Sequence, residues 1–201
     1  LKCLQHNLRL LDMNVKHLGT DNNFLTMRNL INALADMGVE MRSNCECTGI
    51  SGGEDEYVIH TAGGDELTAK DVIIATGRGG AAFVSGFCTE HGVRMRSNSV
   101  DIGVRVEMKD LIWREFSDKI YEPKILYKTK TFEDRCRMFC FNKGGIVSAE
   151  NNHGIITANG HAFAEPDKKT DNCNFAILSS IHFTDPFDQP TQYAENISRL
   201  A

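Results

Sequence analysis

The run DVIIATGRGG at residues 71–80 constrains the fold most strongly, because an apolar stretch ends there in a turn of small residues. Consecutive apolar residues are typical of a strand that is buried on both faces of a parallel sheet. A turn of small residues after such a strand lets the backbone approach a bound phosphate or nucleoside. Residues 71–80 therefore predict a buried strand that ends at a nucleotide site, with an ordinary core strand as the alternative.

The usual first half of a dinucleotide site does not accompany this turn. Such a site ordinarily begins with a glycine-rich loop, G-x-G-x-x-G, and a carboxylate about 20 residues later binds the ribose. No G-x-G-x-x-G run occurs in the sequence. The chain also opens on Leu1 and closes in TQYAENISRLA, which is typical of a helix in progress. We therefore expect the chain to be an excised piece of a longer protein.

Charge and cysteine usage exclude several classes of partner. The formal net charge is -5 and the lysines and arginines are not clustered, which argues against nucleic acid and anionic membrane surfaces. No apolar run approaches the ~20 residues of a membrane span, and no signal-peptide pattern is present. The sequence has 7 cysteines without C-x-x-C pairs, which favours reduced thiols over structural zinc. These features predict a cytoplasmic protein.

The N-terminal half predicts one helix followed by hairpins. Apolar residues recur at helical spacing, Thr20 or Asp21 is the expected N-cap, and Gly38 lies beyond the end. The apolar positions are Phe24, Met27, Ile31 and Leu34. A strand through Val39 and Met41 is expected next, and then short strands joined by glycine-acid turns over residues 44–66.

The C-terminal half predicts a mainly antiparallel unit. A short helix is expected from residue 81 to Gly92, and a second helix over residues 109–120. Alternation over residues 99–108 predicts a half-buried strand, whose polar face is either an outward ion-paired face or the lining of a substrate cleft. That face carries Asp101, Arg105 and Glu107. Further strands are expected over residues 124–132, 135–142, 145–151, 154–160 and 174–183.

Several short segments occur in an order that is similar to a known family. They are HLGTDNN (17–23), ATGRGG (75–80), VDIGVRVEM (100–108), FCFNKGG (139–145), ITANGH (156–161) and NFAILSSIHFTDP (174–186). In these segments the chain resembles the central part of a family of bacterial FAD-dependent dehydrogenases, which are two-dinucleotide-fold flavoproteins of poorly characterised activity. The resemblance covers nearly the whole chain.

The resemblance implies an α+β (α/β) fold, namely the middle portion of an FAD/NAD(P)-binding fold with an inserted mixed, mainly antiparallel sheet domain. The implied domains are 1–90, the central part of a discontinuous FAD-binding domain; 91–188, the inserted substrate-side domain; and 189–201, the start of a returning segment. The implied activity is an oxidoreductase that passes a hydride or electron pair between an unidentified small molecule and FAD, with NAD(P)H as a candidate donor. The isolated chain is expected to be inactive, because the pyrophosphate loop would lie upstream of it.

The resemblance also implies site residues. Ala75, Thr76 and Gly77 are expected at the rim of the FAD site, where Arg78 offers a charge to a phosphate or is simply a solvated arginine. The substrate-side candidates are Cys140, Lys143, Gly144, Gly145, Asn159 and His161. Thr20 and Asp21 match a T-D pair of the family, but helix capping accounts for them.

Each substrate-side candidate has a plain structural alternative. In a strand, Cys136, Met138 and Cys140 would share one face, and Arg137, Phe139 and Phe141 the other. Cys140 is either a redox thiol influenced by Lys143 or a small buried hydrophobe. Relatives often carry a second cysteine and a proline where this chain has Asn142 and Lys143, which speaks against a dithiol.

The glycine and histidine candidates are also open to two interpretations. The Gly144–Gly145 pair is either an anion-binding turn or a hairpin turn, and His161 either exchanges protons or is an exposed residue at a hairpin corner. No histidine spacing indicates a metal site, and no Ser-His-Asp set or G-x-S-x-G elbow supports acyl transfer. A cofactor-free binding module is the alternative function, and an RNA-modifying flavoprotein is disfavoured by the acidic charge balance.

Overall fold

The computed structural model describes residues 2–11, 15, 17–184 and 186–201. Asp185, within the segment 174–186 that carries the family resemblance, lies outside the described residues. The chain forms two compact units: unit 1 is Leu1–Asn29 with Ser97–Ala201, and unit 2 is Leu30–Arg96. The domain boundaries expected at residues 90 and 188 stay a prediction.

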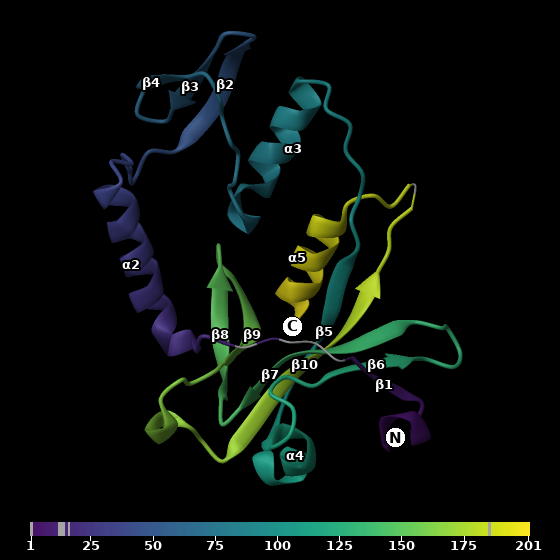
Figure 1. Ribbon diagram of the computed structural model, residues 1–201. Coiled ribbons are helices and arrows are strands. Elements are labelled where there is room, and N and C mark those ends of the chain that lie inside the picture. The colour runs from purple at the N-terminus through teal and green to yellow at the C-terminus, as the bar shows by residue number, and fades with distance from the viewer. Residues whose placement is uncertain (1, 12–14, 16, 185) are drawn as a thin grey trace. The chain divides into compact units, whose positions relative to one another are not determined.

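Unit 1 is built on a five-stranded sheet with the strand order β1-β6-β7-β10-β5 (Figure 1). Its strands are β1 (Leu8–Leu11), β5 (Val100–Lys109), β6 (Lys124–Lys128), β7 (Arg135–Lys143) and β10 (Asn172–Ile181). A separate hairpin joins β8 (Ile146–Asn152) to β9 (Ile155–His161). Every ladder between described strands is antiparallel, so the sheet predicted as mixed is purely antiparallel.

Helices and turns complete unit 1. They are α1 (Lys2–Gln5), η1 (Thr20–Asn22), α4 (Asp110–Ser117), η3 (Pro166–Lys168) and α5 (Pro190–Leu200). The strands and the two helices predicted for residues 99–201 are confirmed, as is the α+β class. The inserted character of this domain stays a prediction.

One face of the sheet of unit 1 holds the apolar core. Phe141 and Phe175 are buried there beside Met138. The ring of Trp113 on α4 packs against them, with its centroid 5.2 Å from that of Phe175 and 5.7 Å from that of Phe141. Helix α4 begins directly after β5, which brings Trp113 to the core residues of β7 and β10 from a neighbouring segment of the chain.

A bulge at Cys140 divides β7 into two registers. Cys140 has φ 51°, and the pairing of β7 with β10 shifts between Asn174 and Ala176. Two residues of β7 therefore face one residue of β10, which reverses the alternation beyond the bulge. The predicted grouping of Met138 with Cys140 is wrong, because Phe141 joins Met138 in the core. Strict alternation could not reveal the extra residue.

Unit 2 contains a three-stranded antiparallel sheet in the order β2-β3-β4. Its elements are β2 (Cys47–Gly53), β3 (Glu56–Thr61), β4 (Glu66–Ala69), η2 (Arg78–Gly80) and α3 (Ala81–Glu90). Helix α2 (Asn23–Asp36) begins in the residues assigned to unit 1 and ends in those assigned to unit 2. The predicted hairpins and both helices are confirmed, with Gly38 at φ 81° and Gly92 at φ 65° just beyond the helix ends.

Two strands expected in this unit are absent among the described residues. Val39 and Met41 belong to no strand, and neither do residues 71–76. Ile73 is 91% exposed, so the segment predicted as buried is largely solvated. A strand exists only where its backbone pairs with a neighbour, and no described strand pairs with residues 71–76.

None of the described helices has the length and apolar character that crossing a membrane requires.

Candidate functional site

The turn at residues 75–80 has a backbone that requires glycine. Gly77 adopts φ 64° and ψ -161°, a region that is almost restricted to glycine. A Cβ added there would meet nothing within 4 Å, so the space beside Gly77 is open. At Gly80 a Cβ would lie 2.2 Å from the Cβ of Thr76. The side chain of Thr76 therefore covers Gly80 and leaves the backbone at Gly77 exposed.

This turn leads directly into helix α3, which begins at Ala81. No side chain caps the start of η2 or of α3. The first backbone N–H groups of a helix lack partners within the helix, and they carry the positive end of its dipole. Arg78 adds an exposed positive charge in the same turn. Residues 77–80 thus form an open backbone turn that a phosphate-bearing ligand could approach closely.

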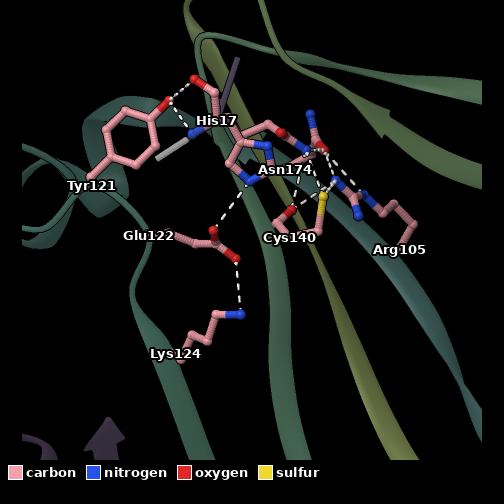
Figure 2. Close-up of polar contacts among 8 residues, drawn as sticks. His17, Arg105, Tyr121, Glu122, Lys124, Cys140 and Asn174 are labelled. Carbon is pink, nitrogen blue, oxygen red and sulfur yellow. Dashed lines mark hydrogen bonds and ion pairs between the residues drawn. The ribbon is translucent and has the colours of Figure 1, made fainter. Parts of the chain in front are cut away.

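A polar cluster lies on the face of the sheet of unit 1 opposite the core, because Asn174 stands between the core residues Cys173 and Phe175 on β10. Figure 2 shows side chains of this cluster. Asn174 on β10 is fully buried, and its Oδ1 accepts hydrogen bonds from Arg105 Nε at 3.0 Å and from Asn142 Nδ2 at 3.0 Å. Arg105 Nη2 also donates to the carbonyl oxygen of Cys140 at 2.9 Å. Three strands are joined by one buried carboxamide.

The Cys140 thiol belongs to this cluster. Its sulfur lies 3.8 Å from Arg105 Nη2 and 3.7 Å from Asn142 Nδ2. Arg105, rather than Lys143, therefore supplies the positive charge beside Cys140. The ammonium of Lys143 contacts the carboxylate of Asp118 and lies 4.0 Å from that of Asp110. Cys140 is partly exposed, and both interpretations of its thiol, a redox partner or a small hydrophobe, stay predictions.

Two glycines let the chain approach the cluster closely. A Cβ at Gly160 on β9 would lie 1.6 Å from Arg105 Nη2 and 2.1 Å from Asn142 Nδ2. A Cβ at Gly145 would lie 2.4 Å from the carbonyl oxygen of His161 and 3.3 Å from Asn174 Nδ2. Gly145, Gly160 and His161 thus lie against the cluster. His161 Nε2 and Asn174 Nδ2 are buried atoms without a hydrogen-bond partner among the described residues.

Gly144 faces the side chain of Lys169, and Asn159 is turned to solvent. Asn159 Nδ2 donates to Glu150 on the exposed side of the β8–β9 hairpin. The segment 158–161 was predicted to be a hairpin corner, but it lies within β9 and the corner is at His153–Gly154. The Gly144–Gly145 turn joins β7 to β8, which do not pair, so it is a turn without a hairpin. Its two carbonyl oxygens accept hydrogen bonds from Thr170.

Thr20 and Asp21 do not cap helix α2. Thr20 Oγ1 accepts a hydrogen bond from the backbone N–H of Ala162 at 3.1 Å, and Asp21 Oδ1 accepts one from Ala164 at 3.1 Å. The backbone N–H of Thr20 donates to Ala162 in return, at 2.8 Å. The capping prediction is wrong, because these side chains bind the segment after β9. The bond from Ala164 holds the pKa of Asp21 below its ordinary value.

A buried carboxylate was not anticipated from the sequence. The side chain of Glu122 is 6% exposed; one oxygen lies 3.1 Å from His17 Nε2 and the other 3.5 Å from Lys124 Nζ (Figure 2). The ammonium of Lys124 and the imidazole of His17 are the polar partners of this buried carboxylate. The Tyr121 hydroxyl accepts a hydrogen bond from the backbone N–H of His17 at 3.2 Å. No spacing in the sequence relates His17 to Glu122.

Arg105 and Asn174 were not among the site candidates. Alternation left Arg105 on a polar face that was either outward and ion-paired or the lining of a substrate cleft, and Asn174 opened the segment 174–186 without a role of its own. An asparagine that precedes an apolar strand was the available signal, since a buried amide must find partners. No group of three or more histidine, cysteine or acidic side chains in the described part of the chain could hold a metal ion.

Residues 2–94 match the family model described as flavin containing amine oxidoreductase. The matched stretch includes the turn at residues 75–80, and it supports an FAD-dependent oxidoreductase with a flavin cofactor. The match gives no support to NAD(P)H as the electron donor. No curated protein matches the chain.

Proposed function

We propose that this chain forms part of an FAD-dependent oxidoreductase, in which Ala75, Thr76, Gly77 and Arg78 contact FAD. The observation that carries the proposal is the match of residues 2–94 to flavin containing amine oxidoreductases, with the glycine turn lying inside it. FAD, when bound, takes up or delivers a hydride or an electron pair. The cytoplasmic location expected from the sequence is part of this proposal.

The described residues fit such a cofactor at one edge. The open space beside Gly77 admits a ligand to the backbone of this turn, which no side chain caps. Thr76 keeps this turn in shape through its contact with Gly80. The side chain of Arg78 adds a positive charge for a phosphate oxygen.

The substrate-facing role falls to unit 1 in this proposal. The cluster around Arg105 and Asn174 fixes Cys140 in a conformation with positive φ, and the rest of unit 1 supports that cluster. A small-molecule substrate is expected, and Arg105 is the group suited to orient an acceptor atom on it. No proton-transfer step is assigned to His161 or Cys140.

One cavity favours a cofactor-free binding module as the second candidate. It has a volume of about 430 Å³ in unit 1, and its lining is three aromatic rings and Pro186, together with Asp188 and Gln189. The rings of Phe183 and Tyr193 lie edge to face, with centroids 5.4 Å apart. Apolar walls with few polar groups are typical of small-molecule sites.

Titration with FAD separates the two candidates. Flavin fluorescence is followed in this chain and in the same chain extended along its reading frame in both directions. Saturable quenching by the extended protein, with weak or no quenching by the 201-residue chain, is the expected result. Quenching by neither protein would remove the flavin proposal and favour the binding module.

A further inference from the structure

A serine, a histidine and a glutamate are aligned on the three-stranded sheet of unit 2. Ser51 Oγ lies 2.8 Å from His60 Nε2, within hydrogen-bond distance. Glu66 Oε1 lies 3.2 Å from Nδ1 of the same ring. The imidazole therefore has a hydroxyl at one nitrogen and a carboxylate at the other. This is the order of groups in a nucleophilic triad.

The strand register produces this alignment. Glu66 on β4 lies directly opposite His60 on β3, and Gly49 on β2 lies opposite His60 on the other side. Ser51 is two residues beyond Gly49, so it is a diagonal neighbour of His60 on the same face. A Cβ at Gly49 would be 3.7 Å from His60 Cδ2, so the ring lies over the glycine and reaches Ser51.

We propose that Ser51, His60 and Glu66 form a nucleophilic triad that accepts the acyl group of a small activated ester. Ser51 Oγ bonds to the acyl carbon while its proton passes to His60 Nε2, and the bond from that carbon to the leaving oxygen breaks. His60 gives the proton to the leaving group or to solvent. Water then releases the acyl group as a carboxylic acid and restores Ser51.

The carboxylate of Glu66 sets the tautomer of His60 in this triad. A proton on Nδ1 is favoured because the carboxylate oxygen beside it accepts a hydrogen bond, which leaves Nε2 free to accept the proton of Ser51. The histidine side chain is 40% exposed and that of Glu66 is 65% exposed, so an ester reaches the site from solvent. The activity is independent of the proposed flavin chemistry, because it needs no cofactor.

No pattern in the sequence indicates acyl transfer, because these residues belong to three strands and match no G-x-S-x-G pattern. The alternative is a hydrogen-bonded surface network that stabilises only the sheet. The two interpretations differ in whether Ser51 becomes acylated. That difference is measurable without knowing any natural substrate.

The test uses p-nitrophenyl acetate with the full chain. Release of p-nitrophenolate is followed by absorbance, and acid-quenched protein is digested to locate the acetyl group by mass spectrometry. We expect acetylation at Ser51, and a loss of at least about tenfold in the protein-dependent rate for Ser51→Ala and His60→Gln. Glu66→Gln is expected to lose less, because it orients the base.

Matched controls come from helix α3. Ser85 and His91 are exposed there, and the His91 ring is bonded to the carbonyl oxygen of Phe87 rather than to a serine. Ser85→Ala and His91→Gln are expected to keep the full rate. Ser51→Cys, which retains a nucleophile, is expected to keep acetylation at position 51 and guards against misfolding of the alanine variant.

The proposal is overturned by either of two results. One is acetylation at lysines or at His60 but not at Ser51. The other is a Ser51→Ala variant that hydrolyses the ester as fast as the unmodified chain. Both would mean that the alignment is a surface network without nucleophilic function.

Discussion

The guanidinium of Arg105 on β5 is held by Asn174 on β10, a side chain that is fully buried in the sheet of unit 1. The same oxygen of Asn174 accepts a hydrogen bond from Asn142 of β7, so one carboxamide links three adjacent strands. A buried acceptor that satisfies several donors is costly to remove, because each donor is then left desolvated and unpaired.

Replacing Asn174 by alanine tests this link. Asn174→Ala is expected to lower the free energy of unfolding by about 2 kcal/mol, since Arg105 Nε loses its acceptor and Asn142 Nδ2 keeps only the carbonyl oxygen of Cys140. Urea unfolding measures the change. The control is Asn159→Ala, which alters an exposed side chain of β9 and is expected to stay within about 0.5 kcal/mol. Equal losses in both variants would show that the buried amide has no special role.

Gly160 is expected to tolerate no side chain. In Gly160→Ala the new Cβ would clash with Arg105 Nη2, because the two atoms would be only 1.6 Å apart. The guanidinium or the hairpin must therefore move. Overpacking of this kind costs about 1–3 kcal/mol. Thermal unfolding compared with Gly86→Ala gives the contrast, because Gly86 lies in helix α3 with nothing within 4 Å of its Cβ position. A Gly160→Ala variant as stable as Gly86→Ala would contradict the described contact.

Asp21 should make the free energy of unfolding depend on pH in the acidic range. Its pKa lies below the ordinary 3.8, chiefly because its carboxylate accepts the backbone N–H of Ala164. A pKa that is lower in the folded state adds stability above the unfolded value, and this contribution is lost as the pH falls through the folded value. Asp21→Asn should therefore lower the urea midpoint at pH 7 and have a smaller effect near about pH 3. Asp55→Asn, in an exposed turn, is the control, and the same pH dependence in both variants would refute the assignment.

Cys173 is expected to be the least reactive thiol of the chain. It is fully buried, and desolvation raises the pKa of its thiol to about 11, with a further contribution from Asp110. At pH 8 only about 0.1% of such a thiol is ionised, and the thiolate is the reactive form. Alkylation with iodoacetamide, followed residue by residue by mass spectrometry, should label the partly exposed Cys88 well before Cys173. Early labelling of Cys173 in folded protein would contradict its burial.

Local patterns in the sequence were sufficient for most elements. Helical spacing from Phe24 and the alternation of residues 99–108 predicted α2 and β5, because one periodicity dominates each segment. The bulge at Cys140 was not predictable, since it depends on pairing with β10. The strand expected at 71–76 failed for a related reason: an apolar run forms a strand only beside a partner strand.

The candidate sites also differ in whether they depend on a local pattern or on strand pairing. Gly77 was predicted from its place in a small-residue turn, which is a local property of the chain. The cluster of Arg105 with Asn174, and the alignment of Ser51, His60 and Glu66, bring together residues from different strands. Their side chains meet only through register, which no single stretch of sequence specifies.

The contact between residues 75–78 and FAD is tested most directly by comparing FAD binding in Gly77→Val with that in Gly38→Val. Both glycines have positive φ and open space beside them, at φ 64° and φ 81°, so valine strains both backbones, but only Gly77 lies in the proposed cofactor turn. Flavin fluorescence is titrated in the extended protein at a temperature where both variants are folded. We expect FAD to bind at least about tenfold more weakly to Gly77→Val and almost unchanged to Gly38→Val. Equal affinity in the two variants would contradict a cofactor contact at residues 75–78.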